Sequence, residues 1–279
     1  MIRIALLENP GSGSGEATSV AGELREAGAQ VTSFGLDRID DARASAPDRI
    51  VVAGGDGSLA PAAVAAAGAG VPLAIVPTGT ANDLARVLGL PGDRAAAVSV
   101  AATGTSTRRL DIAWIGERPF LNVASIGLAP AAARRATGLK RVLGPLAYAV
   151  GGARAAAGAR PIGCLVRCDG ADFFAGEVWQ ATVASSGAFG GGARVDADPE
   201  DGMLDAVVIE AGSRAALAAR AYGLRRGSIG AQRGVRTRRA RAVDLELAGP
   251  TAFNVDGELV ESGSVRFRAD ARAVEVVVG

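Results

Sequence analysis

The first third of the chain repeats one pattern three times: a short apolar run, a loop that contains glycine, and a helical segment. The runs are residues 2–7, 50–53 and 71–76, and the loops that follow them are residues 9–15, 54–57 and 77–80. Strand, loop and helix in this order build right-handed βαβ units and a parallel sheet. Such loops gather at the carboxyl edge of the sheet, where open α/β sheets bind ligands. Residues 1–117 are therefore predicted to form an α/β domain that binds a nucleotide or another phosphate compound.

The remainder of the chain has a different pattern, in which irregularly spaced strands outnumber helical segments. Strands are expected at residues 107–115, 120–126, 162–168, 173–185, 204–209, 243–247 and 264–268, and helices near residues 145–157 and 214–224. This pattern predicts a β-rich second domain over residues 118–268. Residues 269–279 contain another apolar run, 274–278, and periodicity does not decide whether it returns to the first sheet.

Composition narrows the classes of function. The 279 residues include 30 basic and 29 acidic ones, a balance that argues against a general nucleic-acid binder. The chain has no histidine, so a proton acceptor must come from another residue type. Its two cysteines, Cys164 and Cys168, are too few for a disulfide framework or a structural zinc site and are expected to be buried thiols. Prolines interrupt the longest uncharged run, so we expect a soluble, cytoplasmic protein.

The first two loops contain residues that suit contacts with phosphate. The first comprises Asn9, Pro10, Gly11, Ser12 and Gly13 and precedes a helix whose N-terminal N–H groups can bind a phosphate, although such loops are also common connectors. The second comprises Gly54, Gly55, Asp56, Gly57 and Ser58. A carboxylate among glycines can hold a magnesium-bound water or a nucleotide hydroxyl. The alternative is a tight turn in which Asp56 caps the next helix.

The third loop, residues 77–83, is another connection from a strand to a helix. Thr80 or Asn82 can cap the helix that follows. The adjacent polar side chains of Asn82 and Asp83 exceed what a cap requires, and they suit contacts with a nucleotide.

These three loops resemble the NPxSG, GGDGT and PxGTxND motifs of the diacylglycerol kinase catalytic-domain family. Residues 190–192 and 198–205 resemble that family's GGG…P…DGxLD segment, and residues 253–258 resemble its DGE motif. The five motifs follow the family's order over residues 9–258, which is almost the whole chain. The chain is thus similar to the bacterial soluble lipid kinases of this family.

The resemblance implies a Mg²⁺-dependent kinase that transfers phosphate from ATP to a lipid hydroxyl, with diacylglycerol as the leading acceptor. It also implies an ATP site. That site would be formed by Asn9, Pro10, Gly11, Ser12, Gly13, Gly54, Gly55, Asp56, Gly57, Ser58, Thr80 and Asn82. The metal would be held by the Asp201 side chain and the main-chain carbonyls of Asp198 and Met203; without the resemblance, residues 198–205 are typical of an acidic turn.

By the same resemblance, Asp256 and Glu258 are the acidic groups near the acceptor hydroxyl. Phosphoryl transfer needs a group that accepts the alcohol's proton, and without histidine a carboxylate is expected. Two residues apart on a strand end, they are predicted to face the same way, and which of them is the base is left open. Asp256 and Gly257 between apolar runs are also a signal for a hairpin turn, and both interpretations are compatible.

The chain departs from the family pattern at three positions within residues 58–61. Ser58 stands where threonine is usual, and Ala60 and Pro61 replace the usual Asn-Glu pair. These changes keep alternatives open: a kinase of a soluble alcohol or of NAD, or a nucleotide- or lipid-binding protein without catalysis. The oligomeric state is also open, and a homodimer is among the options.

Residues 211–243 contain nine arginines and no acidic residue, and they include Arg236, Arg238, Arg239 and Arg241. Basic residues near an anionic bilayer each add about 1 kcal/mol of attraction, so this segment is expected to contact anionic lipid at the inner membrane face. The alternative is a solvated arginine-rich face. Nucleic acid is disfavoured because Tyr222 is the only aromatic residue in the segment.

Overall fold

The computed structural model describes residues 1–8, 17–128, 130, 160–187, 195–213 and 232–279. Two compact units are present: unit 1 comprises Met1–Ile112 and Asp270–Gly279, and unit 2 comprises Ala113–Ala269. The sequence pattern predicts the division after residue 117 and the start of the C-terminal segment at residue 269. Two strands, β5 (Thr107–Ile115) and β15 (Val265–Val277), have residues in both units.

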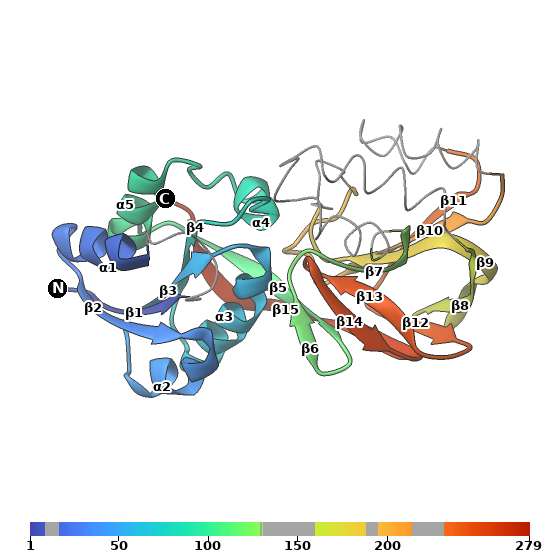
Figure 1. Ribbon diagram of the computed structural model, residues 1–279, viewed down its shortest axis with the longest axis horizontal. Helices are drawn as coiled ribbons and strands as arrows, with labels where there is room; N and C mark the ends of the chain where they lie inside the picture. The colour runs from blue at the N-terminus through green and yellow to red at the C-terminus, as the bar shows by residue number, and fades with distance from the viewer. Residues whose placement is uncertain (9–16, 129, 131–159, 188–194, 214–231) are drawn as a thin grey trace. The chain divides into compact units, whose positions relative to one another are not determined.

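Unit 1 is a parallel sheet with helices packed against it (Figure 1). The strands pair in the order β15-β4-β3-β1-β2, and each of these pairings is parallel. The four remaining strands of that order are β1 (Arg3–Glu8), β2 (Gln30–Gly35), β3 (Arg49–Gly54) and β4 (Leu73–Pro77). The helical elements are α1 (Ala17–Glu26), η1 (Leu36–Arg38), α2 (Ile39–Ala44), α3 (Asp56–Ala69), α4 (Asp83–Val87) and α5 (Arg94–Thr103).

The strands β1, β3 and β4 are buried on both faces, which explains their continuous apolar runs. Leu24 of α1 and Ala101 of α5 pack with Leu6 and Val51 in one core cluster. The alanine-rich helix α3 contacts β3 and β4 and ends at Gly70, whose φ of 67° is left-handed. This arrangement confirms the predicted α/β class with a parallel sheet.

Unit 2 is β-rich, as predicted, and its strands pair in the order β14-β13-β7-β9-β8-β12-β15, with β10 between β9 and β11. The pairings among them are antiparallel. The strands are β6 (Arg118–Phe120), β7 (Val123–Gly127), β8 (Ile162–Cys168), β9 (Ala171–Ala184), β10 (Leu204–Glu210), β11 (Val235–Ala240), β12 (Ala242–Leu247), β13 (Thr251–Val255) and β14 (Glu258–Ser262). Phe120, Phe253 and Phe267 are buried at its core.

The structure contains elements that the sequence pattern did not predict: α5 and β11. The hairpin β13–β14 has the turn that Asp256 and Gly257 signal in the sequence. β11 was missed because four of its six residues are exposed and three are arginines, so it lacks an apolar run. The helices expected near residues 145–157 and 214–224 lie outside the described residues. Within the described ranges, no helix has the length and apolarity needed to cross a membrane.

Candidate functional site

In unit 1, two glycine loops meet at the carboxyl ends of β3 and β4. The Thr78 N–H donates a hydrogen bond to the Gly54 carbonyl (3.0 Å). A Cβ built on Gly79 would lie 2.5 Å from the Cα of Gly55, so the two backbones touch where neither residue has a side chain. The sequence pattern predicts a ligand at this edge of the sheet. Because the two loops meet at glycines, the edge presents backbone atoms rather than side chains at this point.

Asp56 joins the two loops. It is the first residue of α3, and its carboxylate Oδ1 accepts a hydrogen bond from the backbone N–H of Leu84 in α4 (3.2 Å). In α4, Asp83 is buried and forms an ion pair with Arg86 (3.2 Å). Asp56 therefore satisfies an N-terminal N–H of α4, a helix that follows the next strand, and this bond holds the two loops together.

Asn82 has the left-handed backbone conformation, with φ of 49°, immediately before α4. Its side-chain Nδ2 donates to the Gly79 carbonyl (2.8 Å). Its Oδ1 is buried and has no hydrogen-bond partner among the described residues. A buried acceptor without a donor costs about 1–3 kcal/mol, so this oxygen suits a ligand that supplies an N–H or O–H.

The other residues expected at the nucleotide site differ in burial and in the element to which they belong. Ser58 is buried in α3, Gly57 lies in the same helix, and Thr80 is exposed in the loop before α4. The first loop, from Asn9 to Gly13, lies outside the described residues. Glu8, which precedes it at the end of β1, was not predicted as a site residue, and its Oε2 is buried without a partner among the described residues. The sequence signal that could have identified Glu8 is a charged residue at the end of an apolar strand.

In unit 2, Asp256 and Gly257 form the two-residue turn between β13 and β14, with φ values of 46° and 92°. Asp256 is buried, and its carboxylate accepts hydrogen bonds from the N–H groups of Leu121 (2.7 Å), Asn122 (3.0 Å) and Val123 (2.9 Å). The carboxylate thus fastens the hairpin to the segment that leads into β7.

Glu258 begins β14 on the other side of this turn. Its side chain is exposed and forms an ion pair with Arg118 of β6. The sequence predicts that Asp256 and Glu258 face the same way. The structure differs from this prediction, because the turn separates the two residues, and Asp256 is buried while Glu258 is exposed. Arg118 was not predicted, and no motif in the sequence marks it.

A buried polar cluster lies beside this segment. The Ser186 hydroxyl donates to the side-chain oxygen of Asn122 (2.8 Å), and the N–H of Ser185 donates to the Asn122 carbonyl (2.9 Å). All three residues are buried, and the Ser185 hydroxyl has no partner among the described residues. Sequence reasoning assigned them no role, because isolated serines and asparagines give no signal.

The loop expected to hold a metal precedes β10. Asp198 Oδ1 accepts from the Glu200 N–H (3.1 Å), and Asp201 Oδ1 accepts from the Met203 N–H (2.9 Å). The other oxygen of Asp201 lies 3.1 Å from the guanidinium of Arg239. Within the residues that the structure describes, no cluster of three acidic, cysteine or histidine side chains could hold a metal ion.

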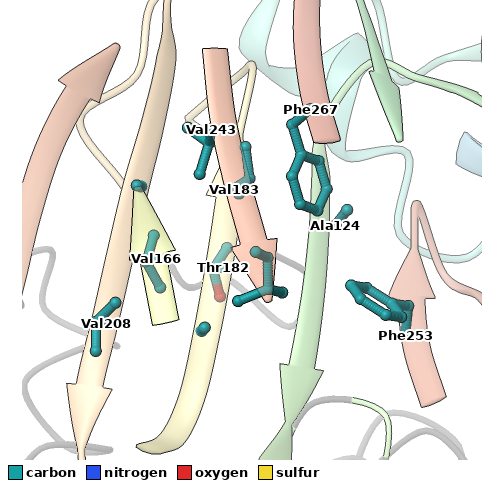
Figure 2. Close-up of a pocket in the computed structure, with 11 residues that line it drawn as sticks. Ala124, Val166, Thr182, Val183, Val208, Val243, Phe253 and Phe267 are labelled. Carbon is teal, nitrogen blue, oxygen red and sulfur yellow. The ribbon is translucent and has the colours of Figure 1, made fainter. Parts of the chain in front are cut away.

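The core of unit 2 encloses a small apolar cavity of about 10 Å³ (Figure 2). Side chains from several strands line it, including Val166, Thr182, Phe253 and Phe267. A cavity of this size holds at most about one water molecule, so it is a packing defect and has no room for an acyl chain.

Comparisons with known proteins agree with this architecture. Residues 3–115 match the family model described as "Diacylglycerol kinase catalytic domain", and residues 122–278 match "YegS C-terminal NAD kinase beta sandwich-like domain". The two matches define the class: a two-unit protein of the diacylglycerol kinase and NAD kinase type. The second match alone spans more than half of the chain, and the chain belongs to the diacylglycerol kinase-like family.

Individual proteins are similar over most of their length. A "Diacylglycerol kinase" of Mycobacterium tuberculosis (strain H37Rv) is 28% identical over 274 residues, which is 92% of this chain and 88% of that protein. A candidate diacylglycerol kinase of Bacillus anthracis str. Sterne has the same fold, with a TM-score of 0.81, 21% identity and coverage of 99% and 97%. An NAD kinase of Archaeoglobus fulgidus in complex with ATP has a TM-score of 0.57 at 14% identity, with coverage of 99% and 93%.

Proposed function

We propose that this protein is an ATP-dependent lipid kinase that phosphorylates a lipid hydroxyl, with diacylglycerol as the leading acceptor and phosphatidic acid as the product. The observation that carries the proposal is the joined pair of glycine loops in unit 1, Gly55 against Gly79, with the Asn82 acceptor left for a ligand. The names of the relatives support the acceptor.

In this proposal the nucleotide binds at the carboxyl ends of β3 and β4. The glycine backbones permit close approach of phosphates, and the Asn82 Oδ1 accepts from a nucleotide N–H or hydroxyl. Asp56 holds the start of α4 in place through Leu84, so the loops are ordered before ATP arrives. ATP enters as its magnesium complex, in which the metal neutralises phosphate charge during transfer.

Glu258 is the residue that we assign as the general base. The oxygens of Asp256 already accept three backbone N–H groups, so its role in the proposal is to fix the hairpin that presents Glu258. The exposed carboxylate of Glu258 can reach a hydroxyl that comes from solvent or a bilayer, and Arg118 orients it. The acceptor's proton then moves to Glu258 as the acceptor oxygen attacks the γ-phosphorus of ATP. The bond from that phosphorus to the bridging oxygen breaks, and ADP leaves.

The substrate would be collected at a membrane surface, and here the structure narrows the predicted arginine set. Arg236 pairs with Glu210 and Arg239 pairs with Asp201, so internal carboxylates neutralise both. Arg238 lies over the ring of Phe173 (5.0 Å), and the described residues form no ion pair with Arg238 or Arg241. We propose these two arginines as the ones that contact anionic lipid.

The test supplies γ-labelled ATP and measures label transfer to a total lipid extract, to diacylglycerol in mixed micelles, to a soluble alcohol such as glycerol, and to NAD. Label in a lipid product with the wild type, formed about 10²–10⁴-fold more slowly with Glu258→Gln, is the expected result. Transfer only to glycerol or NAD would replace the lipid assignment with the soluble-kinase alternative. No transfer to any acceptor would leave a binding protein, an outcome that the unusual Ala60 and Pro61 in α3 make relevant.

A further inference from the structure

The acidic loop before β10 already contacts a cation from its own chain. The guanidinium of Arg239 lies 3.1 Å from Asp201 Oδ2 and 3.6 Å from Asp205 Oδ1. Arg239 is also the register partner of Asp205 across the antiparallel pair β10–β11. Backbone pairing therefore places the guanidinium beside both carboxylates, and opposite charges in directly facing positions stabilise a sheet.

Both oxygens of Asp201 are engaged by groups of the protein. One accepts the Met203 N–H (2.9 Å), and the other faces Arg239. Asp198, another acidic residue of this loop, accepts a hydrogen bond from the Glu200 N–H at its Oδ1 (3.1 Å). Mg²⁺ requires near-ideal octahedral oxygen ligands at 2.0–2.1 Å, whereas a guanidinium has donors that suit two carboxylates at once. The donor set fits an arginine better than a resident metal.

Burial adds a reason for a cation at this place. The side chain of Asp205 is only 14% exposed, so the loop needs a positive group to keep these acids together.

We propose that Arg239 takes the place of a resident Mg²⁺ in the loop from Asp198 to Asp205. The guanidinium neutralises Asp201 and Asp205 and ties the loop to β11, so the loop folds without metal. This inference concerns the stability of unit 2. It does not rest on the proposed kinase activity, and the magnesium that accompanies ATP is a separate matter.

The test is thermal unfolding of the purified chain without ATP or lipid, in EDTA and in MgCl₂ at matched ionic strength. The wild type is expected to have the same Tm in both. Arg239→Met keeps the apolar stem and removes the cation, so its Tm in EDTA should fall by about 2–4 °C. Mg²⁺ should then restore part of the lost Tm, because it can bind Asp201 and Asp205 once Arg239 no longer neutralises them. Adding Asp201→Asn to this variant should abolish the restoration.

Arg236→Met is the matched control, because it removes the ion pair with Glu210 from the same strand and should give no response to Mg²⁺. A wild-type Tm that rises with Mg²⁺, and no longer rises in Asp201→Asn, would overturn the inference. An Arg239→Met variant whose Tm is the same with and without Mg²⁺ would also overturn the inference.

If Arg239→Met fails to fold, Mn²⁺ binding measured by electron paramagnetic resonance on the wild type and Asp201→Asn decides the matter. Equal binding is expected, and tighter binding by the wild type contradicts the inference. Kinase activity is assayed separately, so the failure of the proposed function and of this inference are distinguishable.

Discussion

The carboxylate of Asp56 accepts a hydrogen bond from the backbone N–H of Leu84, 28 positions further along the chain. The bond links the first residue of α3 to the second residue of α4, and so links the two loops at the ends of β3 and β4. Among the contacts described between the loops, this is one that a side chain makes, in addition to the backbone hydrogen bond from Thr78 to Gly54.

Replacement of Asp56 separates its chemical role from this structural one. Asp56→Asn keeps an acceptor oxygen for Leu84, so we expect a Tm close to that of the wild type together with loss of turnover. The control is Asp93→Asn, since Asp93 accepts from the Ala96 N–H at the start of α5 in the same way (2.9 Å). Near-normal turnover in Asp56→Asn would show that its charge has no part in phosphate or metal chemistry.

Gly79→Ala tests the contact between the loops. The new methyl group would lie 2.5 Å from the Cα of Gly55, and backbone atoms cannot move aside as a flexible side chain can. We expect ATP affinity to fall at least about tenfold, measured by titration calorimetry, because the loops must separate. Gly92→Ala is the matched control, since nothing lies within 4 Å of its added Cβ. Equal affinities in the two variants would refute the role of the contact.

Substitutions of Asp256 and Glu258 should have different effects, a loss of stability for Asp256 and a loss of catalytic rate for Glu258. Asp256→Ala removes the acceptor for three backbone N–H groups, two of them buried, and we expect a loss of about 2–4 kcal/mol in unfolding free energy, measured with urea. Glu258→Gln should leave Tm within about 2 °C and lower kcat by about 10²–10⁴-fold, with a modest change in KM.

Glu261→Gln, on the same strand and also exposed, is the control for Glu258→Gln and should keep its kcat. A kcat in Glu258→Gln equal to that of the wild type would mean that Asp256 or another residue is the general base.

The two cysteines give a pH-dependent prediction. Both are buried on β8, as expected from sequence, and burial raises the pKa of each thiol from 9.0 to about 11. Folding therefore favours the protonated form, and the contribution of these thiols to stability falls as pH rises from about 9 to about 11.

Ellman's reagent at pH 8 measures whether the two thiols are buried in the native protein. We expect no reaction with the native protein over minutes and reaction of two thiols in urea. Rapid reaction of either cysteine in the native state would show that the strand opens readily.

Membrane contact through Arg238 and Arg241 predicts a dependence on lipid charge and on salt. The double variant Arg238→Gln, Arg241→Gln should bind anionic vesicles less well and have a raised apparent KM on them, with unchanged turnover on a short-chain soluble substrate. The variant Arg236→Gln, which loses a neutralised arginine, is the control. Vesicle sedimentation that is equal in all three proteins would place the arginines away from the bilayer.

The sequence could predict what depends on local pattern. Parallel strands ending in Gly54 and Pro77 follow from continuous apolar runs and the glycines after them, and the loop contact follows from their shared edge. Two features could not be predicted, because each depends on pairing across the fold. The hydrogen bonds that the Asp256 carboxylate accepts from the N–H groups at the start of β7 join residues over 130 positions apart. The position of Arg239 opposite Asp205 depends on strand register.

β15 has a consequence for the order in which this protein can be completed during synthesis. Val276 pairs with Leu73 of β4, and Val277 belongs to the core of unit 1. Residues 1–112 leave the ribosome first, but they lack this strand until residue 277 has also emerged, after all of unit 2. Until then β4 presents an open edge, so unit 1 is the first to be made and the last to be finished.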